Sequence, residues 1–219
     1  MCVNYWEGRI VITGKLITFE GIDGSGKTTQ LERLKPRLEA LGEKVNVVRE
    51  PGGTALSEQI RGLLLDHDSE NLGWRAEALL FTAARAQLVH EMIIPALERS
   101  EVVLCDRFSA STIAYQGYGR ELPPDELITI QEFAVDHIRP DLIILLDLAV
   151  DVAAVRMMGS SADRMESAGS AFQERVRQGY LKMAKASPDE WLIVDADQTA
   201  DEIALKIASH VENELNKGI

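Results

Sequence analysis

The sequence predicts an α/β fold, a single three-layer domain in which a five-stranded parallel sheet has helices on both faces. Three observations predict it. Five short apolar runs alternate with longer amphipathic stretches along the 219 residues, which is the order of a parallel sheet with helical connections. The runs are apolar at successive positions, as in strands that helices cover on two sides. The 46% hydrophobic content is enough for one sizeable core.

The individual elements follow from these patterns. The expected strands, each a short apolar run, are 15–19, 44–48, 102–106, 141–147 and 191–195. The expected helices, each with apolar residues at helical spacing, are 27–41, 55–65, 75–98, 124–137, 150–157, 170–185 and 199–216. Gly42 ends the first helix, and Pro36 is expected to kink or interrupt it.

Two segments fall outside this alternation. Residues 1–14 form an N-terminal extension of unassigned role ahead of the domain at 15–219, and "RIVITG" within it is either an extra edge strand or a tail. The stretch "GSSADRMESAGS" is small and polar between two helices, so we expect a short mobile lid over about 158–170.

Composition limits the classes of partner and compartment. The net charge of −12 argues against a nucleic-acid polymer or an anionic membrane as partner. Neither a signal peptide nor a membrane-spanning run is evident, so we expect a cytoplasmic protein. Of the two cysteines, Cys105 ends an apolar run and is expected to be a buried small residue.

The most informative stretch is "FEGIDGSGKTTQ", which carries the pattern G-x-x-x-x-G-K-[ST] between a predicted strand and a predicted helix. In this context glycines turn backbone N–H groups toward phosphates, Lys27 reaches the β- and γ-phosphates, and the Thr28 hydroxyl binds Mg²⁺. The predicted ATP-binding residues are Gly21, Ile22, Asp23, Gly24, Ser25, Gly26, Lys27, Thr28 and Thr29. Asp23 is unexpected there, because two like charges about 6 Å apart repel by roughly 3 kcal/mol at an effective dielectric constant of about 20.

Other polar groups are expected at the carboxyl edge of the sheet, where ligands bind in open α/β folds. Asp106 and Arg107 end the third strand, and Arg49 to Thr54, "REPGGT", follow the second. Phe81 and Arg85 share a helix face at i, i+4. So do Ser111 with Tyr115, and Thr112 with Gln116. Each group taken alone is also compatible with a cap, a loop, a core position or a solvated helix.

Together these pieces resemble the thymidylate kinase family of P-loop nucleoside monophosphate kinases. The matching stretches, in the family's order from Lys15 onward, are "FEGIDGSGKTTQ", "REPGGT", "LLFTAAR", "DRFSASTIAYQGYGR", "PDLIILLD" and "DRMES…AFQERVRQGY". The resemblance implies a P-loop kinase fold, a homodimer, and Mg²⁺-dependent transfer of the ATP γ-phosphoryl group to dTMP in dTTP synthesis.

The resemblance also implies roles for single residues. Asp23 would face the acceptor sugar, Phe81 would stack on thymine, and Arg85 would bind a pyrimidine carbonyl. Arg107 would hold the dTMP phosphate, and Asp106 would organise Mg²⁺ together with Thr28. The remaining implied acceptor-site residues are Arg49, Glu50, Pro51, Ser111, Thr112, Tyr115 and Gln116. The implied catalytic set is Lys27, Asp106, Arg107 and Arg164.

The catalytic arginine is where the chain departs from some relatives. Position 24 is Gly, so the phosphate loop carries no arginine, and the lid segment carries only Arg164, with Arg156 at its edge. We therefore predict Arg164 as the catalytic lid arginine and keep Arg156 as a second candidate. Two alternative functions stay open: a related P-loop kinase with another nucleoside or monophosphate acceptor, and a catalytically impaired nucleotide-binding module.

Overall fold

The computed structural model describes residues 12–66, 71–159 and 164–216. It therefore leaves most of the predicted N-terminal extension, the first three residues of "RIVITG" included, and lid residues 160–163 outside the described part. The strands are β1 Lys15–Glu20, β2 Val45–Arg49, β3 Val102–Asp106, β4 Leu142–Asp147 and β5 Trp191–Asp195. They form one sheet of order β2-β3-β1-β4-β5 in which every neighbouring pair is parallel, which confirms the predicted fold class.

Helical segments fill the connections between strands. The longer helices are α1 Lys27–Ala40, α2 Ala55–Leu65, α3 Trp74–Leu88, α6 Pro124–Ala134, α8 Ser170–Ala186 and α9 Ala200–Asn216. The shorter ones are α4 Ile94–Glu98, α5 Ser109–Thr112 and α7 Val150–Arg156, with π-helical turns at Val89–Ile93 and Ile113–Gly119 and a 3₁₀ turn at Glu166–Ala168. Within the described residues no helix is both long and apolar enough to cross a membrane.

The structure shows the details of three predicted helices. The chain is helical from Trp74 to Glu98, as predicted, but a π-helical turn joins α3 to α4 just before Pro95. Pro36 does not interrupt α1, which runs on to Ala40. The predicted helix 124–137 ends at Ala134, because Asp136 and His137 adopt positive φ angles of 49° and 63° and leave the helix.

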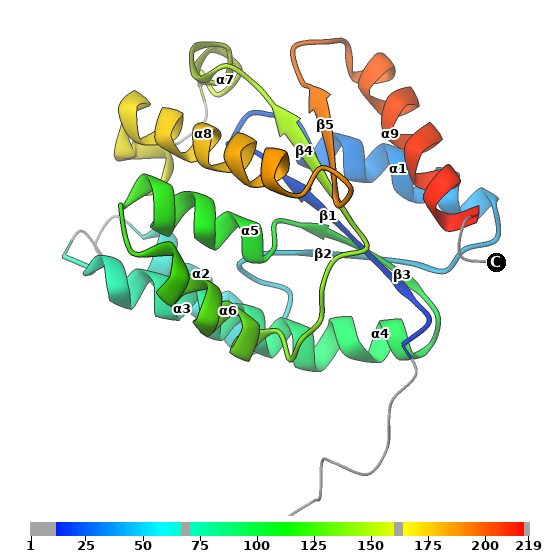
Figure 1. Cartoon of the computed structure of the whole chain (residues 1–219), viewed down its shortest axis with the longest axis horizontal. Helices are drawn as coiled ribbons and strands as arrows, with labels where there is room; N and C mark the ends of the chain where they lie inside the picture. Colours follow the sequence, from blue (N-terminus) through cyan, green and yellow to red (C-terminus); the bar gives the residue numbers. More distant parts are fainter. Residues whose placement is uncertain (1–11, 67–70, 160–163, 217–219) are drawn as a thin grey trace, which may run out of the picture.

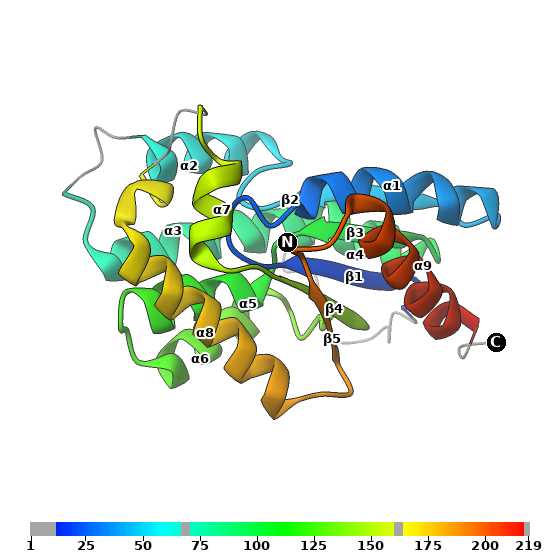
Figure 2. The ribbon, with the colours of Figure 1, turned by 90° about the horizontal axis from the view of Figure 1, so that it is seen from above.

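Helices cover both faces of the sheet (Figure 1). On one face Ile17 and Leu104 pack with Leu34 of α1, beside which α9 lies in both views (Figure 2). On the other face Leu16 and Val103 pack with Ile93 and Leu97 of the α3–α4 segment. Neighbouring residues of one strand thus enter different apolar clusters, as the alternation of a strand requires. Cys105 is buried and free, as predicted.

The strand register brings the predicted site residues to one edge. Asp106 at the end of β3 lies opposite Phe19 of β1 and opposite Arg49 of β2. The segments that follow these three strands, starting at Gly21, Glu50 and Arg107, therefore leave the sheet side by side. This alignment builds the site described next.

Candidate active site

The loop between β1 and α1 has the conformation that its glycines predict. Gly24 and Gly26 have φ angles of 78° and 93°, which glycine adopts without strain. A Cβ at Gly21 would lie 2.5 Å from the Leu146 carbonyl oxygen, so a side chain there would clash with β4. The buried Lys27 Nζ donates to the carbonyl oxygens of Gly21 and Ile22 at 3.1 and 3.0 Å. The loop therefore encloses its own lysine at the N-terminus of α1.

A cavity of about 600 Å³ lies over this loop and is called the phosphate-loop cavity. Among the predicted ATP-binding residues, Asp23, Gly24, Ser25, Gly26, Lys27, Thr28 and Thr29 line it, together with Arg49, Asp106, Arg107 and Arg156. The Ile22 side chain is only 3% exposed and packs in the core instead. A lysine, several arginines and a helix N-terminus thus surround one space, which suits a polyphosphate.

A second cavity of about 150 Å³ adjoins the first, and the predicted acceptor residues except Arg49 line it. Phe81, Arg85, Ser111, Thr112, Tyr115 and Gln116 line it, together with Pro51, Leu65 and Met165. Asp23, Glu50, Arg61, Arg107 and Glu166 line both cavities. The second cavity is thus partly aromatic, with a few polar groups aimed inward, as small-molecule sites are.

Asp23 and Arg107 stand on the wall between the cavities. Arg107 Nη2 donates to Asp23 Oδ1 at 2.6 Å, and the Tyr115 hydroxyl donates to Asp23 Oδ2 at 3.2 Å. Burial raises the pKa of Asp23, but the charges of Arg107 and Lys27 outweigh it and lower this pKa to about 2. Asp23 is therefore a carboxylate at neutral pH. Its charge is balanced by Arg107, which was also a predicted site residue.

Glu20 holds the acceptor side in place, although it was not among the predicted site residues. Its carboxylate is fully buried and accepts from Ser111 Oγ at 2.6 Å, the Tyr180 hydroxyl at 2.8 Å and the Phe108 backbone N–H at 2.8 Å. The Ser111 hydroxyl is thereby engaged with Glu20 at the base of the second cavity. Its position directly before the loop glycine was the signal available in the sequence.

Thr28 and Asp106 form an oxygen pair inside the phosphate-loop cavity. The Thr28 hydroxyl donates to Asp106 Oδ2 at 3.0 Å. Among the described residues there is no cluster of three or more His, Cys, Asp or Glu side chains that fits a metal ion. A hydroxyl and one carboxylate beside a phosphate site do fit Mg²⁺, which takes one or two protein oxygens and completes its shell with phosphates and water.

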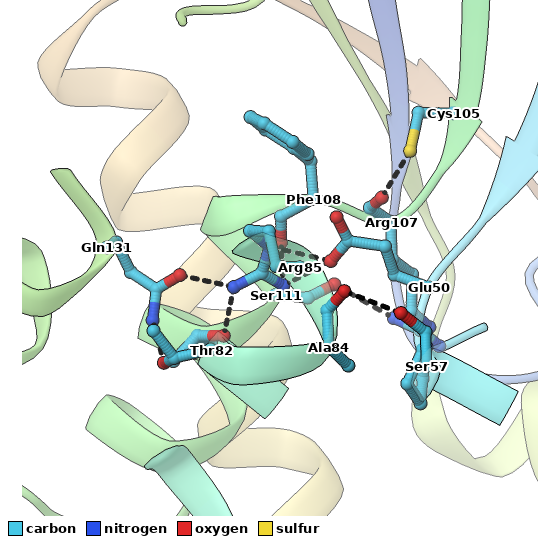
Figure 3. A network of polar contacts seen from close by, with 12 residues as sticks. Glu50, Ser57, Thr82, Ala84, Arg85, Cys105, Arg107, Phe108, Ser111 and Gln131 are labelled. Carbon is cyan, nitrogen blue, oxygen red and sulfur yellow. Dashed lines mark hydrogen bonds and ion pairs between the residues drawn. The ribbon is translucent and has the colours of Figure 1, made fainter. Parts of the chain in front are cut away.

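Arg85 is the centre of a buried network rather than a free donor (Figure 3). It is 1% exposed, and its Nε donates to Glu50 Oε2 at 2.6 Å. Nη1 donates to Thr112 Oγ1 at 2.8 Å and to Gln131 Oε1, and Nη2 donates to the Phe108 carbonyl at 3.0 Å. In this conformation Arg85 positions Thr112 and Glu50, and a base carbonyl would have to displace one of these partners to bind it directly.

The two candidate arginines lie at different places. Arg156 lines the phosphate-loop cavity, and its guanidinium donates to the carbonyl oxygens of Gly24 at 3.5 Å and Ala196 at 2.9 Å. The structure does not bring Arg164 to that cavity. Arg164 is buried, with Nη1 2.7 Å from Glu77 Oε2 and Nε donating to the Leu64 carbonyl at 2.9 Å. Arg49 lines the phosphate-loop cavity while paired with Glu58.

Comparisons with known proteins show the family of this chain. A sequence model of a family described as "Thymidylate kinase" matches residues 19–207. A thymidylate kinase of Bifidobacterium longum is 48% identical over 204 residues, covering 92% of this chain and 98% of the relative. The chain belongs to the thymidylate kinase family. A thymidylate kinase of Citrifermentans bemidjiense is 44% identical over 209 residues, covering 92% of this chain and 93% of the relative.

The fold comparison gives the same result for the thymidylate kinase family. A crystal structure of thymidylate kinase from Ehrlichia chaffeensis superposes with a TM-score of 0.76 at 31% sequence identity. It covers 90% of this chain and 98% of that one. The chain is thus an enzyme of the thymidylate kinase family with the α/β fold of that neighbour.

Proposed function

We propose that the two adjoining cavities carry the reaction of the thymidylate kinase family, ATP-dependent phosphorylation of dTMP to dTDP. ATP lies in the phosphate-loop cavity, and dTMP lies in the second cavity with its phosphate toward the first. One observation carries the proposal: the Asp23–Arg107 pair stands on the wall that both cavities share. The donor and acceptor phosphates then meet beside Arg107, a geometry that favours in-line transfer.

On the donor side, the loop and α1 bind the ATP phosphates. Lys27 moves its hydrogen bonds from the Gly21 and Ile22 carbonyls to phosphate oxygens. Thr28 and Asp106 would hold Mg²⁺ at this point. Once bound, Mg²⁺ supplies positive charge that offsets the negative charge of the β- and γ-phosphates. Arg156 supports the loop through Gly24 and is the candidate arginine already on this cavity.

Arg164, the arginine predicted from the sequence, reaches the transferred phosphoryl group only if its Glu77 pair opens. We keep it as the alternative source of charge in the lid segment. The two arginines make different demands on the structure. Arg156 acts from where it stands, whereas Arg164 requires the lid to move.

On the acceptor side, the second cavity holds the nucleotide. Phe81 provides an aromatic face for thymine, Thr112 and Gln116 provide polar groups for the base edge, and Tyr115 borders the sugar. Arg107 binds the dTMP phosphate. That phosphate oxygen is already anionic near neutral pH, so the transfer needs no strong general base.

The proposed homodimer rests on exposed apolar residues of three neighbouring helices. The exposed fractions are 57% for Leu63 of α2, 56% for Leu79 of α3, and 44% and 90% for Ile128 and Phe133 of α6. In the structure α3 contacts both α2 and α6 (Figure 1). Burial against a second copy would remove this apolar surface from water. Light scattering coupled to gel filtration tests it, with Phe133→Glu expected to shift the mass toward the monomer. The cytoplasmic location stays a prediction.

Product analysis tests the proposed reaction. Incubation with Mg-ATP and dTMP, followed by ion-exchange separation, should give ADP and dTDP in equal amounts. Hydrolysis of ATP without dTDP, or binding of both nucleotides without turnover, would contradict it. The described residues contain no feature that favours another acceptor or a non-catalytic binding module.

A further inference from the structure

Glu77, in the first turn of α3, is a buried carboxylate to which the proposed reaction gives no role. It is 0% exposed and binds three donor side chains, two from residues 116–120 and one from the lid segment. Gln116 Nε2 donates to its Oε1 at 2.9 Å, Arg120 Nε lies 3.2 Å from Oε1, and Arg164 Nη1 lies 2.7 Å from Oε2. Two guanidinium groups therefore balance the carboxylate, and the third partner is a residue of the second cavity.

The chemistry of these groups fixes the orientation of the Gln116 amide. A carboxylate only accepts hydrogen bonds, whereas a glutamine amide has an accepting oxygen at one end and a donating NH₂ at the other. Facing Glu77, Gln116 must present its NH₂, so its Oε1 is the end left for the cavity. Since the two ends of an amide have nearly the same shape, Glu77 rather than packing decides which end meets a ligand.

An acceptor at this position distinguishes between pyrimidines. Thymine and uracil carry an N3–H donor, whereas cytosine has a lone pair on N3 and an amino group at position 4. The Gln116 oxygen would accept from the N3–H of thymine and would face the N3 lone pair of cytosine. A site built around such a hydrogen bond rejects the analogue that cannot form it, because its buried polar group is left without a partner.

We propose that Glu77 is a positioning residue that holds the Gln116 amide with its oxygen toward the second cavity, and so makes this site select bases with an N3–H donor. The inference rests on the proposed function, because it takes the second cavity as the acceptor-base site. Through Arg164 the same carboxylate also anchors the end of the lid segment. Glu77 therefore contacts both Gln116 of the second cavity and Arg164 of the lid segment.

The most direct test compares dTMP with 5-methyl-dCMP, since the two differ only at position 4 and in the proton on N3. In Glu77→Gln the new amide oxygen stays with Arg120 and Arg164, and its NH₂ turns toward Gln116. Gln116 then turns its oxygen to residue 77 and its NH₂ to the cavity. The ratio of kcat/KM for dTMP to that for 5-methyl-dCMP should fall by about tenfold or more. An unchanged ratio would overturn the proposal.

A double variant restores the acceptor without restoring the wild-type residues. In E77Q/Q116E, the amide NH₂ introduced at position 77 donates to the carboxylate introduced at position 116. The other oxygen of that carboxylate faces the cavity and accepts from N3–H, so we expect the dTMP preference to return to within about threefold of wild type. This variant has the charge and nearly the volume of the wild type, so it also serves if Glu77→Gln alone does not fold. A double variant that uses 5-methyl-dCMP as well as dTMP would overturn the proposal.

Arg120→Gln is the matched control for a merely structural effect. Arg120 contacts Glu77, and its Cζ lies 4.0 Å from the ring centroid of Trp74 and 4.6 Å from that of Phe172. It makes no hydrogen bond to the Gln116 side chain. Its loss should lower the melting temperature and leave the dTMP preference within about twofold. If the dTMP preference of Arg120→Gln falls as far as that of Glu77→Gln, the effect comes from a general loss of structure around Glu77, and the proposal is wrong. If instead wild type itself fails to prefer dTMP, the assignment of the base site is wrong, which is a different result.

Discussion

Arg107 Nη2 lies 2.6 Å from Asp23 Oδ1, and this ion pair explains how a carboxylate stands inside a loop that binds phosphates. The Asp23 side chain lines both cavities and reaches the acceptor cavity, where Tyr115 also donates to it. With the pKa of Asp23 lowered to about 2 from 3.8, the pair stabilises the fold above pH 3.8, and this contribution is lost as the pH falls toward 2.

Replacing Asp23 by Ala should therefore affect the acceptor much more than the donor. We expect kcat/KM for dTMP to fall by about tenfold or more, because a charge-assisted contact is removed and Arg107 loses its partner. The dissociation constant for ATP, measured by calorimetry without dTMP, should stay within about threefold. Asp23→Asn serves as the control that keeps the shape. An equal loss of ATP affinity would show that Asp23 belongs to the donor site.

The two candidate arginines can be separated by their alanine variants. Arg156 already lies on the phosphate-loop cavity, whereas Arg164 is paired with Glu77. We expect Arg156→Ala to lower kcat by about tenfold or more, and Arg164→Ala to lower it less while reducing the melting temperature. Steady-state kinetics and thermal unfolding of both variants are the measurement. If Arg164→Ala instead lowers kcat by more than about threefold, and by more than Arg156→Ala does, Arg164 is the catalytic arginine, as the lid sequence predicts.

Glu50 gives the fold a pH dependence with a definite sign. Burial raises the pKa of Glu50 from 4.5 to about 7, although the Arg85 charge opposes the rise. The folded state then binds a proton that the unfolded state has released, so stability falls as the pH rises between these values.

We expect the free energy of unfolding of wild type, relative to Glu50→Gln, to drop by about 2 kcal/mol from about pH 5.5 to about pH 8. Urea titrations of both proteins at intermediate pH values measure this difference. Leu104, fully buried on β3, offers a control that does not titrate. The difference in unfolding free energy between wild type and Leu104→Ala should be the same at every pH. A constant difference between Glu50→Gln and wild type would mean that Glu50 does not titrate in this range.

The fold was predictable because its signals are local. Apolar runs bounded by glycine and charge placed all five strands within a residue or two of their positions. Two details differ from the prediction: the Val89–Ile93 turn is a π-helix, and the helix expected over 124–137 ends at Ala134. Neither is visible in the spacing of apolar residues, because that spacing does not register a change of helix type or a positive φ angle.

The site was predictable where spacing or a strand end positions a residue. Phe81 and Arg85 do line one cavity, and Asp106 does end β3, with Arg107 directly after it. Extending the same i, i+4 spacing by one turn would have found Glu77, which shares their helix face. The sequence could not show which acceptors within the protein compete with a ligand for the hydrogen bonds of a site residue. Arg85 has a charge suited to a base carbonyl but gives its hydrogen bonds to Glu50, Thr112, Gln131 and Phe108.

The most direct test of the central claim is ADP release with Mg-ATP and a panel of acceptors. The panel is dTMP, dUMP, dCMP, dGMP and thymidine, each compared under identical conditions. If the acceptor phosphate binds at Arg107 between the two cavities, turnover is fastest with dTMP and absent with thymidine, which has no phosphate to place there. Turnover of thymidine but not dTMP would contradict the account.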